Sequence, residues 1–321
     1  MLISKKILVS IIIALISAIT SIFFWSKNSS STPGIALDAM YTGQLKHPAH
    51  TVYISGNYVS SELFSNQILL SPDPFFIESY EVLSQNNGDQ LAILSPHYID
   101  VIDEEQILIS EGWGHGIVKV NIVTGKIERF VGPQEGFLHA PHGICHDSNN
   151  GWIYVADSLN SRLLRYKFQD TSSIEIFSDN QKTIAYGRQL VCDSNNVWMT
   201  NSYENRENLN PGQGSNVLKI SNFYSGDVEI IAEFPDVNLT GLAVLQNRWV
   251  IVGLWGQKNK LLMIDTQNHG KHFSIDGPAQ IPGPPYGLYY DDIRKKLLVT
   301  YVGAIHDRSH PGGLAIFSIN L

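Results

Sequence analysis

The stretch that decides the fold is Ala140–Asp157, APHGICHDSNNGWIYVAD, in which a short apolar strand, an Asp/Asn-rich turn and a second apolar strand follow a polar residue. Looser copies start at His97, Arg188, Thr240 and Tyr286, and a weaker one starts at His50. Successive starts, counting His142 as the third, are 47, 45, 46, 52 and 46 residues apart. A repeat of this length made only of short strands is typical of a β-propeller, in which one blade cannot bury its faces alone. The sequence therefore predicts an all-β fold, a six-bladed β-propeller.

The strands of one blade are clearest in the repeat that starts at His142. Apolar runs parted by turn residues predict four strands, at 143–146, 152–156, 162–168 and 174–177. The last repeat has only three strands, the third at 314–319. We expect residues 36–41 to supply the fourth and close the ring, which would leave no unpaired edge between the first and last blades. The Gly/Asn/Pro-rich insertion at 204–215 is predicted to be a surface loop.

The N-terminus has a different character from the repeats. Ile7–Trp25 carries no charge over 19 residues and follows Lys5 and Lys6. At about 1.5 Å per residue this run matches the thickness of a bilayer core, and it lacks the shorter apolar core and small-residue cleavage site of a signal peptide. We therefore expect a transmembrane helix within residues 1–27 (anchor or uncleaved signal), a tether at 28–34 and the propeller at 35–321. The lysines favour a cytoplasmic N-terminus and a periplasmic or extracellular propeller.

Composition limits the function classes. Charged residues make up 16% of the chain and the formal net charge is -8, with no basic run beyond Lys5 and Lys6, so nucleic acid is not an expected partner. The two cysteines, Cys145 and Cys192, do not make a disulfide framework. They stand two residues and one residue before an Asp in neighbouring repeats, which places them slightly out of register. We expect two buried free thiols.

The segment PHGICHDSNNGWIYVADSLNSRLLRY resembles an NHL repeat, with Asp157, Asn160 and Arg162 at the positions of its D-x-x-N-x-R element. The same element occurs in peptidylglycine amidating lyases, and related propellers include the gluconolactonase-like and strictosidine-synthase-like families. The resemblance implies a six-bladed propeller. It implies no single activity, because this architecture carries lyases, lactonases, condensing enzymes and binding modules.

The starts of the innermost strands converge around the axis of a propeller, so the residues there define a candidate site. His50, His97 and His142 lie on consecutive blades and can offer neutral imidazoles to a divalent metal, zinc first, with a further position for water. Alternatively, these residues are polar because water fills the channel. In the amidating lyases, Pro-His pairs at strand starts hold a catalytic zinc. Pro96-His97 and Pro141-His142 match that pattern, whereas His50 follows Ala49.

Other candidate groups surround this ring. Arg188 is expected to stabilise developing negative charge, and Tyr286 to donate a proton or orient a ligand. The strictosidine-synthase-like resemblance implies a channel carboxylate, for which Glu111 and Asp157 are candidates, although Asp157 with Arg162 can instead tie blades together.

The glycine-rich turn at 111–116 is a further candidate, on one rim of the ring. Trp113 can stack on a ligand there and His115 can act as a general acid or base, unless the turn is simply a tight one with an exposed aromatic. A second loop, at 306–311, is rich in titratable residues and carries a weak His-x-x-x-His metal signal.

Two function hypotheses follow. The first is a membrane-anchored, extracytoplasmic propeller that binds a small molecule at the channel and acts as a metal-assisted hydrolase or lyase, with His97 and His142 as the core ligands. The second is a non-catalytic propeller that presents its loops to a protein or a glycan.

Overall fold

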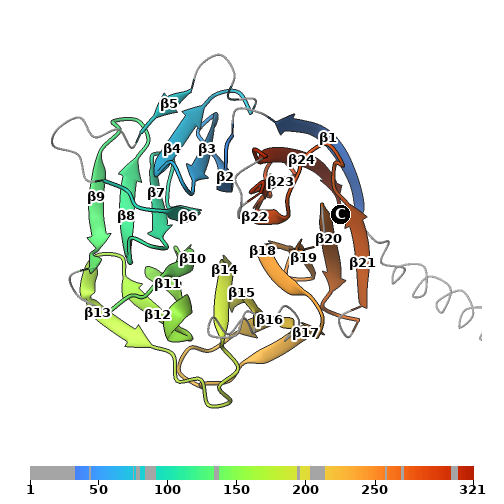
Figure 1. Cartoon of the computed structure of the whole chain (residues 1–321). Helices are drawn as coiled ribbons and strands as arrows, with labels where there is room; N and C mark the ends of the chain where they lie inside the picture. Colours follow the sequence, from blue (N-terminus) through green and yellow to red (C-terminus); the bar gives the residue numbers. More distant parts are fainter. Residues whose placement is uncertain are drawn as a thin grey trace, which may run out of the picture. The chain divides into compact units, whose positions relative to one another are not determined.

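The computed structural model describes residues 33–42, 45–74, 76, 80–83, 92–133, 137–193, 196–202, 214–256, 259–268, 271–304 and 310–321. Within these residues the strands form six four-stranded antiparallel sheets. Figure 1 shows the sheets arranged as blades around a centre, with the first strand of each blade innermost. The prediction of an all-β, six-bladed propeller is confirmed.

The blades follow the chain order, and their strands are as follows. Blade 1 consists of β2 (Pro48–Ile54), β3 (Asn57–Glu62), β4 (Gln67–Ser71) and β5 (Glu81–Val82). Blade 2 consists of β6 (Pro96–Val101), β7 (Gln106–Glu111), β8 (Gly116–Asn121) and β9 (Ile127–Val131). Blade 3 consists of β10 (Pro141–Asp147), β11 (Trp152–Asp157), β12 (Arg162–Lys167) and β13 (Asp170–Ile176), with a short 3₁₀ helix at Ser158–Asn160.

The second half of the ring repeats this plan. Blade 4 consists of β14 (Tyr186–Asp193), β15 (Asn196–Ser202), β16 (Ser215–Ile220) and β17 (Glu229–Phe234). Blade 5 consists of β18 (Asn238–Leu245), β19 (Trp249–Trp255), β20 (Lys260–Asp265) and β21 (Lys271–Asp276). Blade 6 consists of β22 (Pro285–Asp291), β23 (Lys296–Tyr301), β24 (Gly313–Asn320) and β1 (Gly34–Thr42).

The ring closes through its first strand. β1 pairs with β24 and becomes the outermost strand of blade 6, as predicted for residues 36–41. Lys296 Nζ lies 2.6 Å from the Asp38 carboxylate, and the Ser318 hydroxyl donates to the same oxygen at 2.7 Å. The closing strand is therefore held by side-chain bonds in addition to the backbone hydrogen bonds of the sheet.

Burial follows the position of a strand within its blade. Every residue of β11 is buried, whereas β13, at the outer edge of the same blade, alternates between exposed and partly buried residues. The cores lie between neighbouring blades, and one of them packs Tyr154 and Leu163 of blade 3 against Met199 and Leu218 of blade 4. A blade is stable only beside its neighbours because its apolar faces are buried there.

Hydroxyl groups on second strands bond to the inner strand of the next blade. Ser61 Oγ donates to the carbonyl of His97 at 2.7 Å, and Thr200 Oγ1 donates to the carbonyl of Thr240 at 2.5 Å. Ser110 makes the same bond to the carbonyl of His142. Each of these bonds joins the second strand of one blade to the inner strand of the next blade, close to the start of that inner strand.

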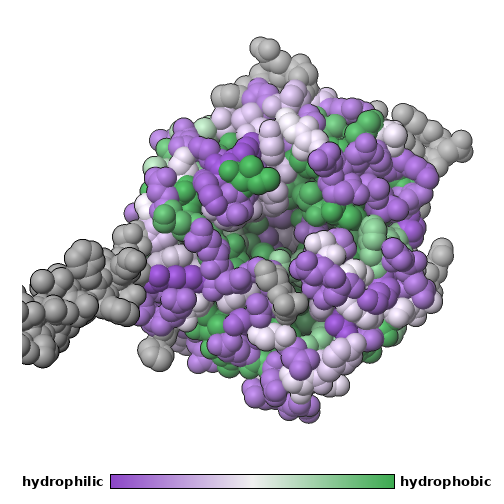
Figure 2. All heavy atoms as spheres, turned by 180° about the vertical axis from the view of Figure 1, so that it is seen from behind, coloured by the Kyte–Doolittle hydropathy of each residue, from purple (hydrophilic) through white to green (hydrophobic). Residues whose placement is uncertain are grey.

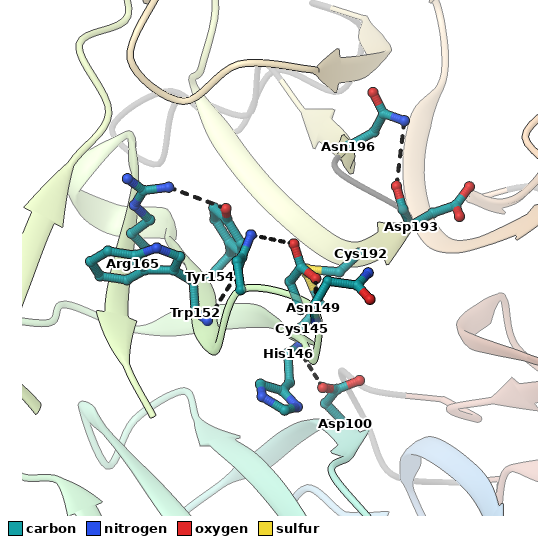
Figure 3. Close-up of a disulfide and its surroundings, with 12 residues drawn as sticks. Asp100, Cys145, His146, Asn149, Trp152, Tyr154, Arg165, Cys192, Asp193 and Asn196 are labelled. Carbon is teal, nitrogen blue, oxygen red and sulfur yellow. Dashed lines mark hydrogen bonds between the residues drawn. A yellow bond between two sulfur atoms is a disulfide. The ribbon is translucent and has the colours of Figure 1, made fainter. Parts of the chain in front are cut away.

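The two cysteines correct the sequence-based prediction of free thiols, which is wrong. Cys145 of β10 and Cys192 of β14 form a disulfide between the inner strands of blades 3 and 4, with the two Cα atoms 5.6 Å apart (Figure 3). The number of residues between each cysteine and the Asp that follows it does not give the relative positions of the two cysteines along the propeller axis, because their strands belong to different blades. The close approach of inner strands near the axis brings the sulfurs together despite that offset.

Residues Ala36–Ser318 form one compact unit that contains the propeller. Residues 1–35 and 319–321 group separately, and the predicted helix and tether, apart from residues 33–34, lie outside the described residues. Across the part of the chain that is described, no helix is long and apolar enough to cross a membrane. Of the insertion at 204–215, only residues 214 and 215 are described.

Candidate functional site

Two of the predicted histidines lie together at the starts of the inner strands. The rings of His97 on β6 and His142 on β10 are 4.4 Å apart between centroids, and both side chains are buried. Each Nδ1 donates to a backbone carbonyl two residues earlier, at 2.7 Å to Ser95 for His97 and at 3.0 Å to Ala140 for His142. In a neutral imidazole this places the proton on Nδ1 and makes Nε2 the acceptor.

Gly112 allows His97 to lie where it does. A Cβ on Gly112 would stand 2.2 Å from Cε1 of the His97 ring, so any side chain at this position would displace the imidazole. The glycine-rich turn after β7 therefore has a role that the sequence did not indicate, which is to let the backbone approach a histidine of its own blade.

Aromatic and cationic groups complete this cluster. The Tyr186 hydroxyl lies 3.2 Å from His142 Nε2, so it donates to the acceptor nitrogen of that ring. The Arg188 guanidinium stacks over the Tyr186 ring at 4.6 Å and lies 5.9 Å from the Trp255 ring. Tyr286 lies 6.0 Å from Trp255 and 6.3 Å from His97, between ring centroids. We call His97, His142, Tyr186, Arg188 and Tyr286 the strand-start cluster.

His50 does not join the cluster. Its Nε2 donates to the carbonyl of Leu288 at 3.0 Å, and its Nδ1 accepts the backbone N–H of Ile99 at 3.1 Å. Burial lowers the pKa of His50 to about 4, so the ring is neutral near pH 7. This histidine joins the inner strands of three blades (1, 2 and 6) through its two nitrogens.

His50, His97 and His142 were predicted to ligate zinc. Catalytic zinc commonly takes three protein ligands, and both nitrogens of His50 bond to backbone groups. Among the described residues, no group of three His, Cys, Asp or Glu side chains is arranged to hold a metal. Zinc binding stays a prediction, and no chemical step below depends on it.

The contacts of Glu111 are those of a residue that stabilises the fold. Its side chain is fully buried, one carboxylate oxygen accepts the backbone N–H of Leu94 at 2.8 Å, and the other pairs with Arg129. Asp157 at the end of β11 is equivalent, because it accepts the N–H of His139 at 2.6 Å and pairs with Arg162 at 2.7 Å.

The same tie recurs in other blades. Glu62 and Asn201, near the ends of their second strands, also accept backbone N–H groups from the segment that leads into the inner strand of their own blade. The repeated position identifies Glu111 as part of this series of ties.

The rim turn presents a different surface. Trp113 is 55% exposed, and His115 accepts the N–H of Ala140 through Nδ1 at 3.0 Å, with its ring 5.2 Å from that of His139. Desolvation, and then the neighbouring His139, lower the pKa of His115 from its ordinary value. His115 is thus a partly buried imidazole that accepts a hydrogen bond through Nδ1. In the 306–311 loop, residues up to 309 lie outside the described residues, and His310 is exposed.

Tyr186 and Trp255 were not predicted from the sequence. Tyr186 stands two residues before Arg188, and strand alternation alone would have placed both on one face of β14. A register irregularity between Gly187 and Leu190 disturbs that alternation, so the pattern was not a reliable guide.

Comparisons of sequence identify no relative. No protein-family model matches the chain. No curated protein matches it either.

Comparisons of structure find many solved chains with a similar fold. A gluconolactonase from Xanthomonas campestris is 13% identical, with a TM-score of 0.63 over 87% of each chain. A PQQ-bound aldose sugar dehydrogenase from Streptomyces coelicolor is 10% identical, with a TM-score of 0.64 over 90% of this chain and 99% of that one. Virginiamycin B lyase from Staphylococcus aureus is 12% identical, with a TM-score of 0.56 over 89% and 99%. At these identities the likeness shows the fold, and it agrees with the NHL and gluconolactonase-like resemblance.

Proposed function

We propose that the strand-start cluster binds a small molecule that bears an electronegative oxygen, and that it performs acid–base chemistry of hydrolytic or lyase type. The observation that carries the proposal is the bond from the Tyr186 hydroxyl to His142 Nε2, under the Arg188 guanidinium. Buried polar side chains that converge on one point among aromatic rings are the usual composition of a small-molecule site.

The residues suggest a division of roles. His142 Nε2 can accept the Tyr186 proton while the Tyr186 oxygen removes a proton from a water molecule or from a substrate carbon. The bond from His142 Nδ1 to Ala140 holds the ring in the tautomer that this transfer needs. Arg188 is placed to stabilise negative charge that develops on a substrate oxygen, and Tyr286 can protonate the leaving group.

Turnover by the propeller (residues 33–321) tests this proposal. The probes are gluconolactone, chosen because a structural neighbour is a gluconolactonase, and a small panel of lactones and esters followed by proton release. Tyr186→Phe should lower kcat by about 100-fold or more, the usual contribution of general acid–base catalysis. Tyr224→Phe, a change at an exposed tyrosine, is the matched control. Equal rates for wild type and Tyr186→Phe, or no turnover of the panel, would contradict the proposal.

A second candidate function rests on the exposed Trp113 in the turn at 111–116, which also carries His115. An exposed indole suits the stacking of a sugar or a protein side chain, with no catalysis. Binding of the wild type to immobilised glycans, lost in Trp113→Ala and kept in Tyr186→Phe, would favour this function. No binding, or unchanged binding of Trp113→Ala, would count against it.

We also propose that the propeller is anchored and extracytoplasmic. Support comes from the apolar run at 7–25 and from the Cys145–Cys192 disulfide, because disulfides persist chiefly in oxidising compartments. Protease treatment of intact cells should digest the propeller, and removal of residues 1–32 should release it from membranes. Protection of the propeller in intact cells would contradict the proposed location.

A further inference from the structure

A cavity of about 140 Å³ lies among the inner strands, toward the ends opposite the strand-start cluster. It is lined by the middle and later residues of β6, β10, β14, β18 and β22, and by His50 of β2. The strand-start cluster is formed by residues nearer the beginnings of β6, β10, β14 and β22. We call this space the strand-end cavity. The proposed function does not use it. Seen as a solid surface, the ring is hollowed at its centre (Figure 2).

Gln189 separates the two regions. Its amide oxygen accepts the N–H groups of Leu242 and Leu288 at 2.9 and 3.1 Å, and its amide nitrogen donates to the carbonyl of Leu288 at 2.6 Å. This side chain therefore reaches from blade 4 to the inner strands of blades 5 and 6, and it also lies 3.4 Å from His50 Nε2. A ligand in the strand-end cavity would contact the Gln189 side chain, which is one of the lining residues.

Asp100 contributes the one carboxylate among the described residues that line the cavity. Its Oδ2 accepts the backbone N–H of His146 at 2.6 Å (Figure 3), and the side chain is surrounded by protein although it is partly accessible from the cavity. The lining residues that the structure describes include no lysine or arginine. A carboxylate in such a place is poorly hydrated and has no cationic side chain in the same wall.

The other titratable groups near Asp100 do not supply a positive charge at neutral pH. Desolvation lowers the pKa of His146 from its ordinary value despite the neighbouring Asp147 and Asp103, and the pKa of His50 is about 4. Burial raises the pKa values of Tyr289 and Tyr290 to about 12, so both are neutral phenols. Burial raises the pKa of Asp100 itself to about 7, against the effect of its backbone hydrogen bonds.

We propose that the strand-end cavity binds a small organic cation, such as a primary ammonium ion, through the Asp100 carboxylate. The half-buried rings of Tyr289 and Tyr290 and the Cys145–Cys192 disulfide form polarisable walls, and aromatic rings attract ammonium groups. The volume limits the ligand to a few non-hydrogen atoms. A metal ion fits less well, because one carboxylate is present where hard cations take six or more oxygen ligands.

The pH dependence follows from the geometry and the sign of the charge. The ammonium ion binds the ionised carboxylate, and with a pKa of about 7 the ionised fraction of Asp100 rises from about 0.1 at pH 6 to about 0.9 at pH 8. Affinity should therefore rise about 10-fold over this interval, while the amine stays protonated. This readout needs no substitution, so it does not depend on the folding of any variant.

The experiment compares three probes with equal numbers of non-hydrogen atoms or nearly so: n-propylammonium, 1-propanol and propionate. Binding to the propeller is measured by calorimetry and by the shift of Tm at pH 6 and pH 8. We expect binding of n-propylammonium only, about 10-fold tighter at pH 8. Asp100→Asn should weaken it at least 10-fold, while Asp170→Asn, the same charge change at an exposed position of β13, should not alter it.

Tyr186→Phe should also leave this binding unchanged, which separates it from the proposed function at the strand-start cluster. Equal affinity for 1-propanol, a flat pH profile, unaltered binding by Asp100→Asn, or no binding up to about 50 mM would each overturn the proposal. Binding of Ca²⁺ or Zn²⁺ that displaces n-propylammonium and is lost in Asp100→Asn would replace the organic cation with a metal and overturn the ligand class.

Discussion

Removal of the disulfide should lower the stability of the propeller by about 4 kcal/mol. Cys145 and Cys192 are 47 residues apart, and a cross-link over a loop of that length removes about 14 cal/mol/K of entropy from the unfolded chain in the loop-closure model. With roughly 2.1 cal/mol/K of unfolding entropy per residue over the unit Ala36–Ser318, this corresponds to a fall in Tm of about 7 °C.

The assay is guanidinium-induced unfolding of the oxidised wild type and of the double variant Cys145→Ser/Cys192→Ser. Reduced wild type is the control, because it loses the cross-link while it keeps both sulfur atoms. Both should unfold with free energies lower than the oxidised protein by similar amounts. The reasoning fails if the oxidised and reduced proteins differ by less than about 1 kcal/mol, or if thiol titration of the unfolded, unreduced chain detects two free cysteines.

Three further predictions follow from the ties and burial described above. The pKa of Asp100 is about 7 in the folded protein and near 4 in the unfolded chain, so ionisation of this carboxyl lowers the free energy of unfolding as the pH rises from 4 to 7. Asp100→Asn should therefore be more stable than the wild type at pH 8, by up to about 4 kcal/mol, and equally stable at pH 4. Urea unfolding at the two pH values measures the difference. Arg129→Met leaves the buried Glu111 carboxylate without its cation and should cost about 3 kcal/mol, whereas Lys126→Met at a surface pair should cost under about 1, by the same measurement. A chain that starts at residue 43 lacks β1 and should aggregate on size-exclusion chromatography, unlike one that starts at residue 33.

The repeat predicted the architecture because its period and its strand content are both visible along the chain. The start at His142 and the missing fourth strand of the last repeat were sufficient to place β1, and the structure confirms that placement. These inferences depend on local sequence patterns, which can be recognised without knowing how the blades pack against each other.

The site was less predictable because it depends on contacts between blades. Each inner strand has a register irregularity near its start, for example between Pro141 and Ile144, so strand alternation does not say which side chains face the axis. The sequence therefore predicted His97 and His142, whose rings are in contact, but also His50, which bonds to the backbone of two other blades. The role of Asp100 depends on burial, and no spacing rule reveals it.

The closing strand has a consequence for synthesis. Among the strands of the propeller, β1 is the first to be made, and its partner β24 begins at Gly313, so about 270 residues are made between them. At roughly 5–20 residues per second this takes about 15 to 55 s, during which β1 has no native partner. Blades 1 to 5 each carry their four strands within one continuous segment and can assemble in that interval, whereas blade 6 cannot. Completion of the ring therefore waits for β24, and this delay sets how long the nascent chain depends on chaperones or on its own charged residues, such as Asp38, to avoid pairing with another chain.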